Sequence, residues 1–283
     1  MAVTDTGDRV DMTTGSVTPR LFKLAWPLVA GNLLQTAYNL ADIFWVGRVS
    51  AEAVAAVALM FPTSWMFVSV AMGLTAAANA IVSQHIGAGN ERAAQRAVGQ
   101  TVLLAVAVAT ALAIAGYLER RPLVGLIGAD GTVIRIAIAY NEVIFLAIPF
   151  TFLFFVVRAV LRAAGDTKTA MWLVAVSAGL NIVIDPVFIL GRGPAPAMGA
   201  RGAAVATLLA RIVAAAVGIY ILLDGGWGIR LRVPDLLPDR DVLRRLVAVG
   251  YPATFDGLAR RTSRSGSRSG TGKRIPQPPS RRM

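Results

Sequence analysis

Long apolar blocks recur along this 283-residue chain and constrain its fold more than any other feature. A helix needs about 20 mostly apolar residues to cross a bilayer, and blocks of this length dominate the sequence. Charged residues make up only 16% of the chain, against about 25% in soluble domains. The sequence therefore predicts an all-α membrane protein with a six-helix transmembrane lobe and the start of a seventh helix. The predicted spans are 21–46, 54–82, 98–118, 133–157, 170–190, 203–223 and 246–258.

The positive charge lies at the flanks of the apolar blocks and in one tail. Formal net charge is +12, but residues 260–283 contribute eight Lys and Arg and no acid. The other basic residues mostly flank apolar blocks, as in proteins that span a lipid bilayer. Counted beside alternate span ends, they favour a cytoplasmic amino terminus by thirteen to six. We expect a multi-pass protein of the cell membrane, with the lipid bilayer as a partner and no nucleic acid.

The sequence divides into five segments. These are a polar cytoplasmic tail (1–18), the amino-terminal six-helix lobe (19–224), a cytoplasmic inter-lobe linker (225–245), the start of a seventh transmembrane helix (246–259) and a basic low-complexity tail (260–283). Trp26-Pro27 and Tyr251-Pro252 each open an apolar run after basic residues, which suggests the start of a second, parallel copy of the lobe. The apolar run stops at Ala259. We expect a truncated or frameshifted product, with a natural disordered basic tail as the alternative.

Composition excludes several kinds of chemistry. The chain has no cysteine and one histidine, which excludes thiolate and multi-histidine metal sites. The sequence shows no nucleophile–base pair and no metal-ligating cluster. We expect neither an enzyme nor a bound cofactor.

The first apolar block carries a stripe of polar side chains. At 100° per residue, Asn32, Gln35, Tyr38, Asn39 and Asp42 share one side of a helix that is otherwise apolar. Lipid cannot cover such a stripe, so it must face protein or water. A polar seam between helices explains the amides. It does not explain an ionisable acid, which costs about 2.5–3.5 kcal/mol at mid-membrane, so we take Asp42 as a functional candidate.

The fifth block holds a second acid. Ser177, Asn181 and Asp185 follow each other at i, i+4 and i+8 and share one helix face. Pro186 removes a backbone donor and leaves a carbonyl oxygen without its helical partner. This oxygen-rich setting suits Na⁺ or a proton, with Asp185 and Asn181 as the Na⁺ ligands. The alternative is that Asp185 lies near the outer interface and is hydrated.

Several stretches in order together resemble the multidrug and toxic compound extrusion (MATE) family, in its DinF-like branch. They are Leu24-Ala25-Trp26-Pro27, Asn39-Leu40-Ala41-Asp42-Ile43-Phe44-Trp45-Val46-Gly47, Ser83-Gln84-His85-Ile86-Gly87-Ala88-Gly89, Leu161-Arg162-Ala163-Ala164-Gly165-Asp166-Thr167-Lys168-Thr169, Asn181-Ile182-Val183-Ile184-Asp185-Pro186 and Gly199-Ala200-Arg201-Gly202-Ala203-Ala204-Val205-Ala206-Thr207. Any one motif is weak, but the ordered set, over residues 18–258, is fairly specific.

The resemblance implies half of a twelve-helix, two-lobe transporter that exports organic cations or drugs in exchange for H⁺ or Na⁺. By motif, Asp42 and Asp185 resemble the coupling acids of the amino-terminal lobe. Asn181 and Thr207 resemble their polar partners, and Tyr38 resembles a cavity neighbour. The chain departs from the family in length, which leaves open whether it transports alone or needs a second-lobe polypeptide as a partner.

Two other functions compete with this one. A lipid-linked oligosaccharide flippase of the same superfamily would need a large cationic groove for its phosphates. Separately, Arg158 and Arg211 depart from the resemblance, because a drug-cation cavity should avoid positive charge. The paired acids favour the antiporter instead. A truncated membrane fragment that does not transport is the third possibility, and the basic tail favours it.

Overall fold

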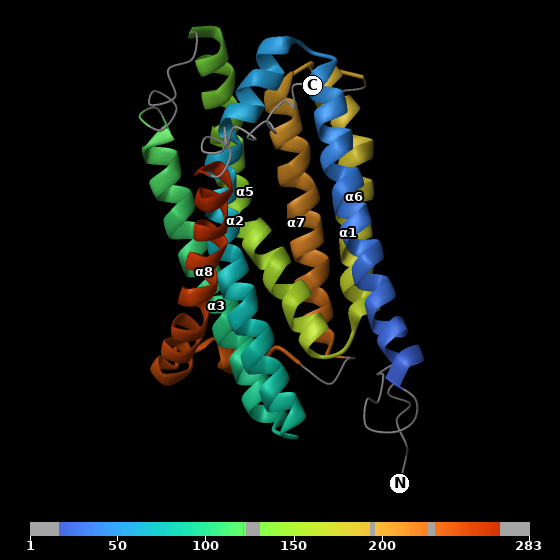
Figure 1. Ribbon diagram of the computed structural model, residues 1–283, viewed down its shortest axis with the longest axis vertical. Coiled ribbons are helices and arrows are strands. Elements are labelled where there is room, and N and C mark those ends of the chain that lie inside the picture. The colour runs from blue at the N-terminus through green and yellow to red at the C-terminus, as the bar shows by residue number, and fades with distance from the viewer. Residues whose placement is uncertain (1–16, 121, 123–130, 193–195, 226–229, 267–283) are drawn as a thin grey trace, which may run out of the picture.

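The computed structural model describes residues 17–120, 122, 131–192, 196–225 and 230–266 (Figure 1). The α-helices are α1 (Val17–Gly47), α2 (Ala51–Gly87), α3 (Glu91–Leu118), α5 (Gly131–Ala163), α6 (Thr167–Leu190), α7 (Ala200–Asp224) and α8 (Arg240–Gly266), and a short 3-10 helix, η1 (Val233–Leu236), precedes α8. No strand occurs in these ranges. The predicted all-α fold is confirmed.

Most helices extend beyond their apolar blocks because polar residues cap them outside the apolar region. Ser50 accepts the amide hydrogen of Ala53 and starts α2, and Asn90 does the same for α3 through Ala93. Asp166 caps α6 through the amide of Thr169 at 2.9 Å. Such caps satisfy amides that have no partner in the first helical turn. The predicted spans are therefore shorter than the helices that contain them.

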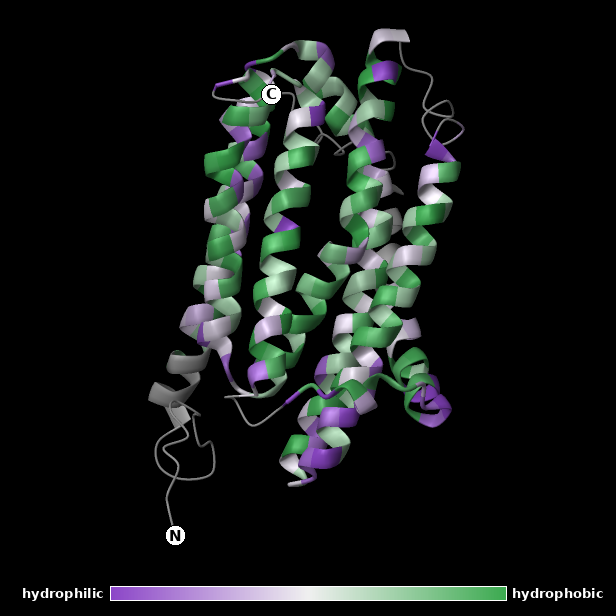
Figure 2. Cartoon of the chain, turned by 180° about the vertical axis from the view of Figure 1, so that it is seen from behind, coloured by the Kyte–Doolittle hydropathy of each residue, from purple (hydrophilic) through white to green (hydrophobic). Residues whose placement is uncertain are grey.

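Five helices of the described chain are long and apolar enough to cross a membrane: α2, α3, α5, α6 and α7. The first predicted span, residues 21–46, is not among them, although α1 has 31 residues. Its amides and Asp42, which form the polar stripe, lower the mean hydropathy of the helix. In Figure 2 the helix middles are largely hydrophobic, and hydrophilic residues gather near the helix ends and in the loops.

Helix α5 crosses obliquely between two groups of helices (Figure 1). Helices α6 and α7 lie on one side of it with α1, while α2 and α3 lie on the other with α8. Its most extensive contacts are with α7 and α2, whereas α1 packs mainly on α6. Both groups therefore depend on α5 for their relative position, and α5 supplies the largest buried side chains of the core, among them Phe145, Phe152 and Phe154.

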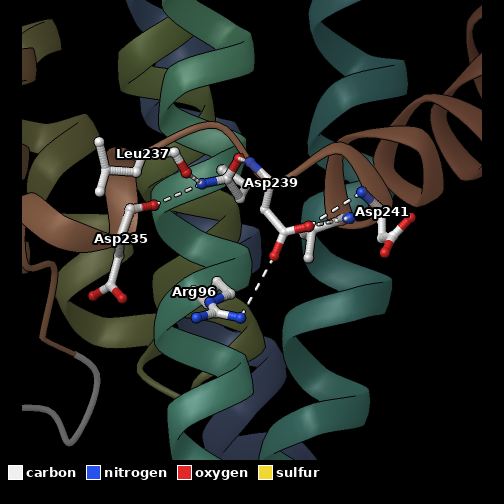
Figure 3. A network of polar contacts seen from close by, with 7 residues as sticks. Arg96, Asp235, Leu237, Asp239 and Asp241 are labelled. Atoms are coloured by element: carbon white, nitrogen blue, oxygen red, sulfur yellow. Dashed lines mark hydrogen bonds and ion pairs between the residues drawn. The ribbon is translucent and has the colours of Figure 1, made fainter.

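The segment before α8 is held in place by one buried amide. We call residues 231–239 the strap; it runs past α3 (Figure 3). Gln100 of α3 is fully buried, and its Nε2 donates to the carbonyl oxygens of Asp235 at 2.8 Å and Leu237 at 2.7 Å. Its Oε1 accepts the backbone N–H of Asp239 at 2.9 Å. The predicted linker 225–245 thus contains an ordered segment that is fixed to the lobe.

Asp239 connects the strap to the start of α8. Its Oδ1 accepts the amides of Asp241 at 3.1 Å and Val242 at 3.3 Å, which caps the helix. Its Oδ2 lies 3.5 Å from Nη1 of Arg96 on α3. Because the Arg96 side chain is mostly exposed, this ion pair adds little stability, and the cap and Gln100 position the helix.

Helix α8 then packs along α2 at two glycines. A Cβ on Gly73 would lie 2.7 Å from the carbonyl oxygen of Gly250 and would collide with the side chain of Thr254. Small residues allow helix backbones to approach this closely in a membrane. The repeated segments that begin α1 and α8 therefore dock on different helices, α1 on α6 and α8 on α2.

We predict that Gln100→Leu exposes the strap to protease. The substitution leaves three backbone groups without partners, at about 1–3 kcal/mol for each one that stays buried. Tryptic cleavage after Arg232, followed by mass spectrometry of the purified chain, should accelerate at least about tenfold for a loss of that size. Gln95→Leu, on the same helix, is the control and should cleave like the unaltered chain. Equal rates for both variants would show that Gln100 does not hold the strap.

The docking of α8 on α2 predicts a specific cross-link. An ideal Cβ on Gly250 lies 3.6 Å from the Cβ of Ala77, within the range that a disulfide requires. Because the chain contains no cysteine, the variant Ala77→Cys/Gly250→Cys should lose two hydrogens in its intact mass on mild oxidation. Ala77→Cys/Val249→Cys places the second thiol at an exposed neighbour and should stay reduced; the opposite pattern would contradict this packing.

Candidate functional site

Polar residues from α1, α5, α6 and α7 meet inside the lobe. Tyr38 of α1 is buried, and its hydroxyl lies 3.0 Å from Oγ1 of Thr207 on α7. Its ring also faces the guanidinium of Arg211, whose ζ carbon is 5.5 Å from the ring centroid. Tyr38 thus links the stripe on α1 to two residues of α7 that are one turn apart.

The two acids predicted from the sequence lie in this region, and three of their carboxylate oxygens are buried without a hydrogen-bond partner among the described residues. Asp185 of α6 is fully buried, and neither of its carboxylate oxygens has a partner among the described residues. The same is true of Oδ1 of Asp42. Asp42, Asp185, Tyr38 and Tyr140 lie near enough to one another for a charge on either acid to act on the other three groups. Two buried carboxyl groups this close can lower their energy by taking up a proton or a cation.

Asn181 and Ser177 continue the polar face of α6 away from Asp185. Asn181 is fully buried, and in the described structure neither its amide nitrogen nor its amide oxygen has a hydrogen-bond partner. Ser177 accepts a hydrogen bond from Nη1 of Arg211 at 3.3 Å. The spacing of these three residues therefore does put them on one buried face. Helix α6 continues through Pro186 to Leu190.

The structure does not bring Gln35 and Asn39 to the acids. Nε2 of Gln35 donates to Oδ1 of Asn39 at 3.4 Å on the exposed side of α1. Asn32 is exposed too. Helix α1 turns the Tyr38 edge of its stripe towards the lobe and the amide edge away from it. No contact among the described residues links these amides to Asp42 or Asp185.

Several residues of the region carried no clear signal in the sequence. Tyr140 of α5 is buried within electrostatic range of both acids. Its neighbour Asn141 is also buried and donates to Sδ of Met60 at 2.6 Å. Glu142, which is polar within a predicted span, pairs with Nε of Arg120 at 3.1 Å. The different contacts of Tyr140, Asn141 and Glu142 could be predicted only from the packing of α5 on the other helices.

The acids do not form a multidentate metal cluster. No group of three or more His, Cys, Asp or Glu able to hold a metal ion occurs in the part of the chain that the structure describes. The oxygens of Asp42, Asp185 and Asn181 that lack hydrogen-bond partners could serve as donors to a monovalent cation. This donor set fits Na⁺ or a proton better than a tightly held divalent ion.

Comparison with known proteins identifies the family. A model of the MatE family matches residues 27–187. The chain is 31% identical over 234 residues to the probable multidrug resistance protein YoeA of Bacillus subtilis, which covers 81% of this chain and 50% of the relative. It is 29% identical over 216 residues to the FAD transporter of Shewanella oneidensis, with 76% and 48% covered.

The fold agrees with the sequence match. The structure of a MOP superfamily transporter from Pyrococcus furiosus superimposes with a TM-score of 0.79 at 30% identity, covering 86% of this chain and 53% of that one. The chain spans about half the length of the curated relatives it matches. The matched segment contains Tyr38, Asp42, Asn181 and Asp185, and the chain belongs to the MatE family of membrane transporters.

Proposed function

We propose that this chain forms the ion-coupling lobe of a secondary antiporter that exports organic molecules in exchange for H⁺ or Na⁺. The observation that carries the proposal is the pair Asp42 and Asp185, whose buried oxygens lack partners in the described structure. An ionisable residue inside a membrane lobe is expensive and is retained where it serves transport. The proposed orientation has the amino terminus in the cytoplasm.

The pair of acids offers a simple coupling device. When both carboxyl groups are charged, they repel each other, and little water is present to screen the two charges. A proton or Na⁺ bound between them removes this repulsion and favours the arrangement in which α1 and α6 lie close together. Release of the ion favours separation. The bond from Tyr38 to Thr207 would transmit the movement of α1 to α7, so ion binding would bias a movement of the whole lobe.

The substrate class and the partners are part of the proposal. The sequence favours organic cations, and the Bacillus subtilis relative is named a multidrug resistance protein. The Shewanella oneidensis relative is named an FAD transporter, and FAD is a dinucleotide that carries negative charge. Because the chain spans half of these relatives, we propose a second lobe as its partner, supplied by the same protein or by a second polypeptide.

A lipid-linked oligosaccharide flippase is the second candidate, and one observation favours it. Arg158 and Arg211 lie inside the lobe (Arg211 is buried and Arg158 partly so), where a flippase would hold phosphate. A flippase does not by itself require the buried pair of acids, and ion coupling does. The antiporter therefore remains the better proposal.

Ion binding should be measurable as added stability. A ligand that binds only the folded chain raises its unfolding temperature. In detergent, Na⁺ at constant ionic strength, or a lower pH, should raise the melting temperature of the chain. Asp42→Asn and Asp185→Asn should each abolish this rise. Glu52→Gln, an exposed acid on α2, is the control. A rise that survives in both Asn variants would remove the ion site from these acids.

Transport itself can be tested in proteoliposomes that contain the chain. They are loaded either with ethidium, an organic cation, or with flavin mononucleotide, an organic anion, and an inward gradient of H⁺ or Na⁺ is imposed. The gradient should accelerate release of at least one of the two, and Asp42→Asn and Asp185→Asn should stop this acceleration. Gradient-independent release of both dyes would contradict antiport by this chain alone, and adding a second lobe then tests whether it restores coupling.

A further inference from the structure

Two arginines lie against the same aromatic ring in the interior of the lobe. The ζ carbon of Arg211, on α7, is 4.4 Å from the centroid of the Phe154 ring, and that of Arg158, on α5, is 5.2 Å from it. Phe154 of α5 is fully buried and contacts Arg211 of α7. Helices α5 and α7 make the most extensive helix contact in the lobe. Because both distances end at one centroid, the two ζ carbons lie no more than 9.6 Å apart.

No carboxylate neutralises this pair in the part of the chain that the structure describes. Arg96 pairs with Asp239 and Arg120 with Glu142, and neither ion pair involves Arg158 or Arg211. Arg211 is buried, and its described hydrogen bond goes to the neutral hydroxyl of Ser177. Aromatic rings compensate a buried cation only partly. The positive charge is thus retained without an acid to balance it, which is costly unless another group supplies the negative charge.

The acids of the lobe occupy a different level. Asp185 lies eight residues along α6 from Ser177, whose hydroxyl bonds to Arg211. The Tyr38 hydroxyl bonds to Thr207, one turn along α7 from Arg211. The interior therefore has an acidic level at Asp42 and Asp185 and a basic level at Arg158 and Arg211. The acidic level can bind the positively charged coupling ion, and the basic level can bind a negatively charged group.

A third arginine extends the basic level towards the end of α5. Arg162 follows Arg158 by one turn, and the Nε atoms of both are buried without a hydrogen-bond partner among the described residues. Asp166, the next acid in the sequence, caps α6 through Thr169. It makes no ion pair with Arg162 within the described ranges. The three guanidiniums form a row from the helix end to the interior.

We infer that Arg158 and Arg211 bind a phosphate group of the transported substrate, with Arg162 on the route to them. Guanidinium groups present paired N–H donors that match phosphate oxygens, and the rings of Phe154, Phe155 and Tyr38 around Arg211 suit a flat organic body. The inference rests on the proposed transport function and narrows its substrate to an aromatic organic phosphate. The substrate would then be negatively charged, whereas the family resemblance implies an organic cation.

A matched pair of probes tests the inference. Flavin mononucleotide and riboflavin share their ring system and differ by one phosphate, and both report binding through flavin fluorescence. The purified chain in detergent should bind flavin mononucleotide at least about tenfold more tightly than riboflavin, as expected for charge-assisted hydrogen bonds. Inorganic pyrophosphate should displace the nucleotide. Binding is read without any ion gradient, so this result is independent of whether Asp42 and Asp185 couple transport.

Variants locate the phosphate. Arg158→Gln and Arg211→Gln should each reduce the preference for flavin mononucleotide at least about threefold, since each removes part of the charged hydrogen bonding. Arg135→Gln on α5 and Arg201→Gln on α7 change exposed arginines of the same helices and should leave it unchanged. If Arg211→Gln does not fold, Arg158→Gln and pyrophosphate competition decide. Equal affinity for the two flavins, or a preference retained in both interior variants, would overturn the inference; the guanidiniums would then serve to pair with carboxylates of a second lobe.

Discussion

Charge inside an apolar lobe is the constraint on which the rest of this structure depends. Water stabilises a carboxylate or guanidinium by many kcal/mol, and a helix bundle in a membrane replaces little of that stabilisation. Most described helices satisfy the constraint by placing their charges at the ends, as the caps at Asp166 and Asp239 do. Interior acids and arginines violate it, and they gather where α1, α5, α6 and α7 meet. These buried charged residues, more than the apolar residues around them, indicate the position of the candidate functional site.

Helix α5 makes this arrangement possible because it packs against α2, α3, α6 and α7. It contributes Phe154 and Arg158 to the basic level and Tyr140 to the acidic one, and it packs on α2 and α3 with its other side. A displacement of α5 would therefore change the surroundings of both charge levels at once. Coupling between an ion and a substrate needs such an element, which has to respond to both sites.

Residues on one helix were predictable from the sequence, and contacts between helices were not. The four-residue spacing of Ser177, Asn181 and Asp185 predicted a common buried face, and the structure has it. Periodicity could not tell which edge of the α1 stripe faces inward. Helical angles put Gln35 and Asn39 near Asp42, yet the packing of α1 on α6 leaves those amides outside. The contact between Gln100 and the strap joins residues 135 or more positions apart, and no local pattern announces it. Family motifs identified Asp42 and Asp185 as a pair before any geometry was known.

The attachment of the strap also changes where the mechanical boundary of the lobe lies. The sequence predicts that α8 opens a second repeat. The hydrogen bonds of Gln100 fix the start of α8 to α3, and the close approach of Gly73 to Gly250 fixes its next turns to α2. In the proposed movement of the lobe, α8 would move together with α2 and α3. A movement of α2 and α3 would therefore be passed directly to α8 through the strap and the glycine contact.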